Sequence, residues 1–249
     1  MKFYHSKQLN SEPNVTHAFT TRYSGNLAFH VNDDPLVVEA NHERLAKELG
    51  YKKESLIHMK QIHSNLVHTV NDEDNFHMPR SCDALITNKK NTPLMVMTAD
   101  CAPLLFYDKV KKVIAVAHAG RQGAFKNIVK NVLEKMSLEF ASNPKDIYVS
   151  IGANIGVCCY EVGREIYDEA QELQLEYAVQ IRDESYYLDI NKILKTQLLE
   201  CDIKTENIEF SNECTCCKKE TYYSYRAQKV TGRFCGILML DDKGHGKEE

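Results

Sequence analysis

Three short segments of this sequence place metal-binding or nucleophilic side chains beside turn residues, at the ends of apolar runs. They are Gln61-Ile62-His63, Thr98-Ala99-Asp100-Cys101 and Ala117-His118-Ala119-Gly120. Two neutral imidazoles and one thiolate suit zinc and leave the fourth tetrahedral position open for water or substrate. Such an open site is typical of catalytic zinc, which lowers the pKa of a bound water and holds a cysteine as its thiolate.

The spacing of these three residues also fits an ordinary structural interpretation. A histidine at the end of a strand is more often a satisfied polar residue than a ligand, and a cysteine in an apolar strand usually fills space. The three side chains are far apart in the sequence, and no compact zinc signature joins them. The residue types alone therefore leave both interpretations open.

The segment after His118 has the composition of an anion site. A loop flanked by Gly120 and Gly123 precedes a helix that we expect from Ala124. Such a loop presents free backbone N–H groups and the positive end of the helix to a phosphate. An ordinary helix start would show the same pattern, so both interpretations stay open here too.

Hydrophobic periodicity predicts the elements that carry these segments. One helix is predicted to begin at Asp33 or Asp34, beside Pro35, and to end at Gly50. A second is predicted over 124–140, where apolar residues recur with a helical period, and two or three more over 165–199. Strand-like runs occupy 55–59, 65–70, 84–87, 94–98, 104–107, 113–117, 147–151, 208–210, 222–225 and 234–240.

The order of these elements indicates an α+β fold with a large mixed sheet system. Helices come before, between and after clusters of strands, without the regular alternation of a doubly wound sheet. A chain of 249 residues with 43% hydrophobic residues can bury one core, and no linker divides it. We therefore expect one domain over residues 1–249, with a frayed polar tail at 241–249.

Composition restricts the partners and the compartment. The chain has 35 acidic and 31 basic residues, and no stretch concentrates lysine and arginine. This favours a small-molecule substrate and argues against binding to nucleic acid. The N-terminus lacks the apolar core of a signal peptide, and no apolar run approaches the ~18 residues that span a bilayer. We therefore expect a cytoplasmic protein that does not bind membranes.

The nine cysteines are an odd number, so they cannot all be paired in disulfides. Cys158-Cys159 and the segment Cys214-Thr215-Cys216-Cys217 stand out, because C-x-x-C is a spacing of metal ligands. A second metal site is one interpretation. Buried structural thiols are the favoured one, because the sequence does not show whether the two segments lie together.

Ordered blocks of this sequence resemble the laccase-domain (YfiH-like) purine nucleoside phosphorylase family, also called polyphenol oxidases, which includes peptidoglycan editing factor-like members. The blocks extend over roughly residues 20 to 238 and include TTRYSG, KQIHS, CDALIT, TADCAPLLFYD, IAVAHAGRQG, IGANIGVCCYEVG and YSYRAQKVTGRFCGIL. The resemblance implies a four-layer α/β/β/α fold with mixed β-sheets, related to Cys/His toxin deamidases. It assigns Zn²⁺ to His63, Cys101 and His118 as catalytic ligands. It also implies phosphorolysis of adenosine, inosine, guanosine and methylthioadenosine, and deamination of adenosine.

The same resemblance suggests substrate-binding residues. Arg22, Asp83, Asp100 and Arg226 match family blocks, and they could contact substrate, orient the zinc ligands or belong to structural ion pairs. The family usually reads HAGWRG, whereas this chain reads HAGRQG, so Arg121 lies one position early in the expected pocket wall. The expected partners are a nucleoside and phosphate, bound by a monomer or a small homo-oligomer.

Three other functions stand beside the zinc nucleoside enzyme. In a thiol amidase or deamidase acting on peptidoglycan precursors, Cys101 would be the nucleophile and His118 the base, and a chelator would not inhibit it. A multicopper oxidase is disfavoured, because none of the ten histidines forms an H-x-H pair. Cu²⁺ could still replace zinc adventitiously. A binding module without catalysis would need the three-ligand site to be occluded.

Overall fold

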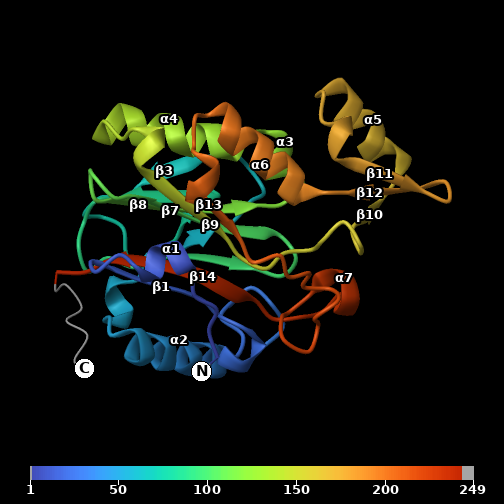
Figure 1. The fold of residues 1–249 in the computed structure, drawn as a ribbon. Coiled ribbons are helices and arrows are strands. Elements are labelled where there is room, and N and C mark those ends of the chain that lie inside the picture. The colour runs from blue at the N-terminus through green and yellow to red at the C-terminus, as the bar shows by residue number, and fades with distance from the viewer. Residues whose placement is uncertain (1, 243–249) are drawn as a thin grey trace.

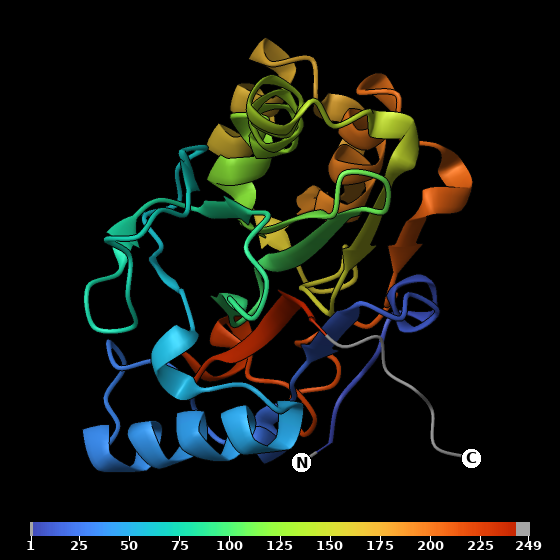
Figure 2. The ribbon, with the colours of Figure 1, turned by 90° about the vertical axis from the view of Figure 1, so that its left-hand side faces the viewer.

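The computed structural model describes residues 2–242, which form four layers (Figure 1). Helices α3 (Arg121–Phe125), α4 (Ile128–Phe140) and α6 (Ile190–Glu200) cover one face of a six-stranded sheet. A three-stranded sheet packs on the other face, and α2 (Pro35–Leu49) covers that sheet in turn, as Figure 2 shows from the side. The predicted α+β class and the order helix, sheet, sheet, helix are confirmed.

The six-stranded sheet has the order β13-β9-β7-β8-β5-β3, and its strands are parallel only in the two edge pairs. The three-stranded sheet, β1-β14-β6, is antiparallel throughout. The strands of these two sheets are β1 (Val15–Phe19), β3 (Val67–Thr69), β5 (Ala84–Thr87), β6 (Leu94–Thr98), β7 (Ala102–Asp108), β8 (Val113–Ala119), β9 (Ile147–Ile151), β13 (Ile208–Phe210) and β14 (Phe234–Leu240).

Smaller elements lie around these layers. Two small sheets pair β2 (Met59–Lys60) with β4 (Arg80–Ser81), and β10 (Glu161–Val162), β12 (Ser185–Leu188) and β11 (Val179–Arg182) in that order. The short helices are α1 (Lys7–Asn10), α5 (Arg164–Glu172), α7 (Tyr225–Gln228) and the 3-10 turns Arg22–Ser24, Lys53–Ser55, Pro144–Asp146, Glu176–Ala178 and Thr205–Asn207. Helix α5 and the strands β10 to β12 project at the side of the helical layer (Figure 1).

The alternation of side chains along the central strands produces the layers. In β8, Ala115 and Ala117 face the covering helices, whereas Ile114 and Val116 face the second sheet. Successive side chains of a strand point to opposite faces, so a strand covered on both sides must be apolar at every position. The central strands are apolar runs for this reason.

Two of the predicted helices show how local signals set their ends. Helix α2 begins after Asp34, whose side chain accepts a hydrogen bond from the Leu36 N–H, and ends at Gly50 with φ 73°. The single helix predicted over 124–140 is wrong, because the chain breaks at Asn127, which has φ 52°. Asn127 caps α4 through its side chain, so α3 and α4 are separate helices.

Two other predicted segments differ from the structure. Between α5 and α6 the chain forms the hairpin β11–β12, whose turn residues Asp183 and Glu184 both have positive φ, as a two-residue hairpin turn requires. The strand predicted at 222–225 is absent. The Tyr222 N–H instead donates to the Lys218 carbonyl within a turn, while the Tyr222 ring packs against Phe234.

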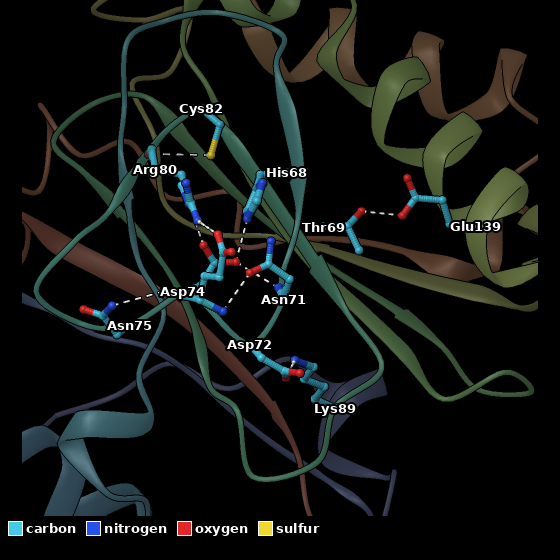
Figure 3. Close-up of polar contacts among 11 residues, drawn as sticks. His68, Thr69, Asn71, Asp72, Asp74, Asn75, Arg80, Cys82, Lys89 and Glu139 are labelled. Atoms are coloured by element: carbon cyan, nitrogen blue, oxygen red, sulfur yellow. Dashed lines mark hydrogen bonds and ion pairs between the residues drawn. The ribbon is translucent and has the colours of Figure 1, made fainter.

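The connection between β3 and β5 is held in place by Asp74 (Figure 3). Its buried carboxylate accepts hydrogen bonds from the Asn71 N–H at 2.9 Å and from Arg80 Nε at 2.7 Å, and it lies 2.6 Å from His68 Nε2. This network orders the acidic loop before β5. It thereby fixes the path of the chain into Asp83, the residue before that strand.

The first two residues of the expected frayed tail make polar contacts with the rest of the protein: Asp242 accepts a hydrogen bond from Asn91 Nδ2 at 2.9 Å and lies 3.0 Å from Lys90 Nζ. The Asp241 N–H donates to the Asn14 carbonyl at 3.0 Å, and Thr16 Oγ1 donates to the Asp241 carboxylate at 2.7 Å. The rest of the predicted tail, from residue 243 on, lies outside the described residues. Among residues 2–242 there is no helix of the length and apolar character that crossing a membrane needs.

Candidate metal centre and its cavity

His63, Cys101 and His118 come together where the chain passes from one sheet to the other. The ligand atoms of the three side chains all lie within 4.8 Å of one another. Cys101 ends the turn that connects β6 of the three-stranded sheet with β7 of the six-stranded sheet. His118 is the penultimate residue of β8, and His63 lies in the loop between β2 and β3. Each ligand is therefore attached to, or close to, a rigid strand end.

Gly120 makes this close approach possible. A Cβ atom at this position would lie 2.7 Å from Cys101 Sγ and 3.4 Å from His63 Cδ2. Contacts of 2.7 Å are not tolerated by real side chains, so only glycine fits behind the thiol. The rings of His63 and His118 meet edge to face, with their centroids 4.9 Å apart.

Asp83 orients two of the three candidate ligands from behind. Its fully buried carboxylate lies 2.9 Å from His118 Nδ1, which leaves Nε2 of that ring for a metal. The same carboxylate accepts hydrogen bonds from the N–H groups of His63 and Ser64, at 3.1 and 2.7 Å. Because His63 has φ 58°, a conformation that non-glycine residues rarely adopt, these bonds hold a strained loop. Asp83 does not line the cavity described below.

The pKa values of Asp83, Cys101 and His118 are shifted by the contacts among these residues and their neighbours. Burial raises the pKa of Asp83, but hydrogen bonds from His118 and Ser64 lower it to about 2. Burial also raises the pKa of Cys101, but the charge and hydrogen bonds of His118 and His63 lower it to about 6. Burial lowers the pKa of His118, but Cys101 and Asp83 raise it to about 9. Cys101 is therefore a thiolate at neutral pH when no metal is bound.

The donor set fits a zinc ion. Zinc takes imidazole nitrogen at about 2.0–2.1 Å and thiolate sulfur at about 2.3 Å in a tetrahedral arrangement, so its ligand atoms lie within 4 Å or so of one another. The three ligand atoms here are grouped within 4.8 Å, and one of the two imidazoles has a carboxylate on its other nitrogen. His63, Cys101 and His118 also line one cavity, so the fourth side faces open space.

Asp100 lies beside Cys101 and lines the cavity described below, and each oxygen of its carboxylate accepts one hydrogen bond from the protein. Oδ1 accepts a hydrogen bond from Thr215 Oγ1 at 2.6 Å, and Oδ2 accepts one from the Arg226 N–H at 2.6 Å. Its backbone has φ 89°, which is strained for a residue with a side chain. Asp100 therefore holds the Cys101 turn against the loop that carries Thr215 and against helix α7, which carries Arg226.

The cavity in front of the three candidate ligands has a volume of about 430 Å³. This is the size of small-molecule sites in proteins. Four cationic residues, Arg121, Arg226, Lys229 and Arg233, line it. The last three form no ion pair with any residue within 2–242, so their charge is available to an anionic ligand. Arginine and lysine are the side chains that most often bind phosphate.

Arg121 and the expected anion loop are placed differently from the prediction. Helix α3 begins at Arg121, so residues 121–123 form its first turn rather than a loop. The helix has five residues, too few for a strong dipole at its N-terminus. Arg121 lines the cavity and forms an ion pair with Glu169 of α5. Cationic side chains therefore contribute positive charge to the wall of the cavity.

Arg226 lies at the cavity, as expected, whereas Arg22 lies outside it. The Arg226 guanidinium donates to the carbonyls of Cys159 and Glu161, at 3.2 and 2.8 Å, and packs over the Tyr160 ring. The Arg22 guanidinium donates to the Lys219 carbonyl and packs 5.1 Å from the Tyr223 ring centroid. Arg22 therefore supports a loop instead of facing the cavity.

The cavity has further polar residues that the sequence analysis does not name as candidates for substrate binding, among them His30, Gln61, Tyr160, Lys229 and Arg233. Four of them stand inside the blocks KQIHS, IGANIGVCCYEVG and YSYRAQKVTGRFCGIL, so the signal was present but did not single them out. Burial raises the pKa of Tyr160 to about 12, so its hydroxyl stays protonated and can donate a hydrogen bond to a ligand.

The chain is similar to proteins that are already known. A family model described as multi-copper polyphenol oxidoreductase laccase matches residues 16–241. Purine nucleoside phosphorylase YlmD of Bacillus subtilis is 32% identical over 248 residues, covering 92% of this chain and 89% of that protein. Purine nucleoside phosphorylase YfiH of Escherichia coli is 32% identical over 217 residues, covering 86% of each. The crystal structure of Bacillus licheniformis hypothetical protein YfiH superimposes with a TM-score of 0.86 at 30% identity, covering 91% of this chain and 93% of that one.

Proposed function

This chain belongs to the multi-copper polyphenol oxidoreductase laccase family, and from that premise we propose that it is a zinc-dependent purine nucleoside phosphorylase. The family description names copper, but the names of the curated relatives refer to nucleoside chemistry. The observation that carries the proposal is that the three candidate metal ligands and a wall of unpaired cationic side chains face one cavity.

His63, Cys101 and His118 would hold the zinc, with Asp83 fixing the orientation of His118. When bound, zinc would supply Lewis-acid polarisation at the inner end of the cavity. Three donors suit one ion, and no further histidine within 2–242 joins this cluster, which disfavours a multicopper centre. Copper would then be an adventitious substitute for zinc.

The remaining cavity residues would bind and orient the substrates. Arg226, Lys229 and Arg233 would bind the phosphate anion and neutralise part of its negative charge as it approaches C1′ of the ribose. The Tyr160 hydroxyl, protonated at neutral pH, would donate a hydrogen bond to the nucleoside.

The first test is turnover of inosine and adenosine by the purified full chain, with and without phosphate, before and after chelation. We expect release of the base and formation of ribose 1-phosphate that require phosphate and are lost on chelation. The Cys101→Ala variant should lose one zinc per chain and this activity while staying folded. Base release that is unaffected by phosphate would contradict phosphorolysis, and full activity in chelator would contradict zinc dependence.

Phosphate binding has a matched pair of variants. Arg233→Gln should raise the KM for phosphate about tenfold, because a charged hydrogen-bond donor to the anion is removed. Arg22→Gln is the control, since Arg22 lies outside the cavity and its loss should leave this KM unchanged. Equal effects of the two variants would argue against a phosphate site at the cationic wall.

Deamination of adenosine and phosphorolysis of methylthioadenosine belong to the same proposal. Both substrates carry the purine and ribose that the cavity would hold. Adenosine differs from inosine only at C6, and methylthioadenosine differs from adenosine only at C5′. Ammonia release and methylthioribose 1-phosphate formation measure them in the same preparations. If the Cys101→Ala variant loses adenosine deamination, methylthioadenosine phosphorolysis and inosine phosphorolysis together, all three reactions occur at one site.

One alternative function has support from the same geometry. The thiol of Cys101 and the imidazole of His118 lie together, which is the arrangement of a cysteine hydrolase. Such an enzyme would hydrolyse amide bonds, including those of peptidoglycan precursors, in the presence of a chelator. Amide hydrolysis by the metal-free protein, lost in Cys101→Ala, would replace the zinc proposal.

A further inference from the structure

A second group of metal-binding side chains lies on the surface, outside the site described above. The Sγ atoms of Cys158, Cys159, Cys214 and Cys217 all lie within 4.8 Å of one another. Cys158 and Cys217 are exposed, and the other two are partly exposed. The interpretation of these residues as buried structural thiols is therefore wrong. All four are reduced and open to solvent in the structure.

We propose that Cys158, Cys159, Cys214 and Cys217 form a second metal centre, a structural zinc site that joins the loop 153–160 to the loop 211–224 beside the cavity. Four thiolates complete the tetrahedral shell of zinc, which leaves no open position for a substrate. The site would therefore stabilise the structure and would not take part in the chemistry.

The spacing of the sulfur atoms supports a shared ion. Cys217 Sγ lies 3.5 Å from Cys158 Sγ and 3.4 Å from Cys159 Sγ. Four sulfur atoms about 2.3 Å from one zinc ion would be about 3.8 Å apart, whereas the two sulfur atoms of a disulfide are about 2.05 Å apart. The observed separations are those of ligands grouped around one ion.

The local backbone supports the same arrangement. Cys214 and Cys217 have the C-x-x-C spacing, and the Gly156 N–H donates to Cys214 Sγ at 3.2 Å. A backbone donor aimed at a sulfur stabilises the thiolate form that a metal needs. A Cβ at Gly156 would lie 3.3 Å from Cys214 Cβ and 3.6 Å from Cys214 Sγ, so the glycine lets the two loops approach closely.

The first of the two loops that this ion would join lines the cavity, and the second contacts Asp100, which lines it too. Backbone hydrogen bonds already connect them, from the Asn154 N–H to Glu213 and from the Thr215 N–H to Asn154. Tyr160 of the first loop lines the cavity, and Thr215 of the second binds Asp100, the neighbour of Cys101. An ion at the four cysteines would therefore keep the cavity wall in register with the first metal centre.

The test is zinc content of the full chain purified under reducing conditions, measured with protein concentration in the same sample. The wild type should contain about two zinc ions per chain, and Cys158→Ser/Cys217→Ser about one. Cys216→Ser is the matched control, because Cys216 lies in the same loop but outside the group of four, and it should keep about two. Cys101→Ala should keep about one, which separates the second site from the first.

If the double cysteine variant does not fold, a spectroscopic measurement on a protein that keeps all four cysteines still tests the proposal. Co²⁺ added to metal-free Cys101→Ala protein should give the intense sulfur-to-metal charge-transfer band of a four-thiolate site. Equal zinc content in the wild type and the double cysteine variant would overturn the proposal. So would the absence of that cobalt band, or intact-mass evidence that the four cysteines form disulfides in freshly purified protein.

Discussion

At the scale of single residues, Asp83 has the most consequences for the metal centre. One carboxylate accepts hydrogen bonds from the backbone around His63 and also holds the ring of His118. Two ligands from different parts of the chain are thus positioned by the same buried charge. A carboxylate behind a metal-binding histidine fixes the ring and raises its basicity.

The Asp83→Asn variant tests this role. The amide cannot accept all of these hydrogen bonds and does not carry the charge, so we expect zinc affinity at the first centre to fall about 10- to 100-fold. Competition with a chromophoric chelator measures it. Asp108→Asn is the control, because Asp108 is equally buried but holds the turn between β7 and β8. Unchanged affinity in Asp83→Asn would show that the carboxylate does not support the ligands.

The thiol of Cys101 has its own pH dependence in metal-free protein. Because His118 and His63 outweigh burial and lower the pKa of Cys101 to about 6, the reactive thiolate should form as pH rises through about 6. Alkylation of Cys101 with iodoacetamide, followed by peptide mass spectrometry, should therefore reach its plateau near neutral pH. In His118→Ala the profile should move to higher pH, since the largest favourable interaction is gone.

Two controls complete this measurement. Zinc should protect Cys101 in the wild type, because a coordinated thiolate reacts slowly. Cys82, whose pKa burial raises to about 12, should stay unmodified over the same range. Alkylation of Cys101 that begins only near pH 9 in the wild type would mean that the imidazoles do not stabilise the thiolate.

At the scale of elements, the site depends on where strands and helices end. The turn between β6 and β7 crosses from one sheet to the other and carries Asp100 and Cys101. The left-handed backbone at Asn127 ends α3 after one short turn and starts α4. These breaks keep Arg121 at the cavity while α4 runs across the sheet. The turn between β6 and β7 and the left-handed residue Asn127 therefore position the side chains of the candidate site.

Asn127 offers a test of such a break. Asn127→Ala should lower the free energy of unfolding by about 2 kcal/mol, because it removes the cap of α4 and places alanine at positive φ. Asn127→Gly should cost about 0.5 kcal/mol, since glycine adopts this conformation freely. Urea denaturation measures both. If the two variants were equally unstable, backbone conformation would not be the cause.

At the scale of the whole molecule, the proposed first metal centre would connect the layers. Its ligands come from the β2–β3 connection, the crossing between the two sheets and β8 of the six-stranded sheet. An ion that binds only the folded chain stabilises it by mass action. The metal should therefore contribute to the stability of the whole fold as well as to activity.

Metal removal tests this contribution. Zinc at a hundredfold excess over its Kd should stabilise the fold by about 2.7 kcal/mol per site. For a chain of this size that corresponds to roughly 5 to 10 °C in unfolding temperature. Scanning calorimetry of the wild type with zinc and with chelator should show the sum of this difference over the two sites, and Cys101→Ala should show only the part due to the four-cysteine site. An unfolding temperature that does not respond to chelation would exclude both metal centres as stabilising elements.

Much of this architecture follows from local sequence. The strands at 84–87, 94–98, 147–151, 208–210 and 234–240 were predicted with the bounds they have, because apolar runs favour buried strands regardless of their partners. The capping residue Asp34 and the terminal Gly50 likewise set the ends of α2 by short-range hydrogen bonding and backbone conformation. Recognisable blocks around His63, Cys101 and His118 pointed to the candidate ligands before their positions were known.

Tertiary structure alone decided the rest. The two cysteine segments lie 59 residues apart, yet Cys158 and Cys217 meet at 3.5 Å, and nothing local distinguishes this from separate buried thiols. The cavity wall depends equally on long-range packing, which placed Arg233 at the site and Arg22 outside it. Periodicity and propensity act over a few residues, whereas contacts between distant loops depend on how whole layers pack. The elements could therefore be predicted from the chain, and the site they enclose could be located only in three dimensions.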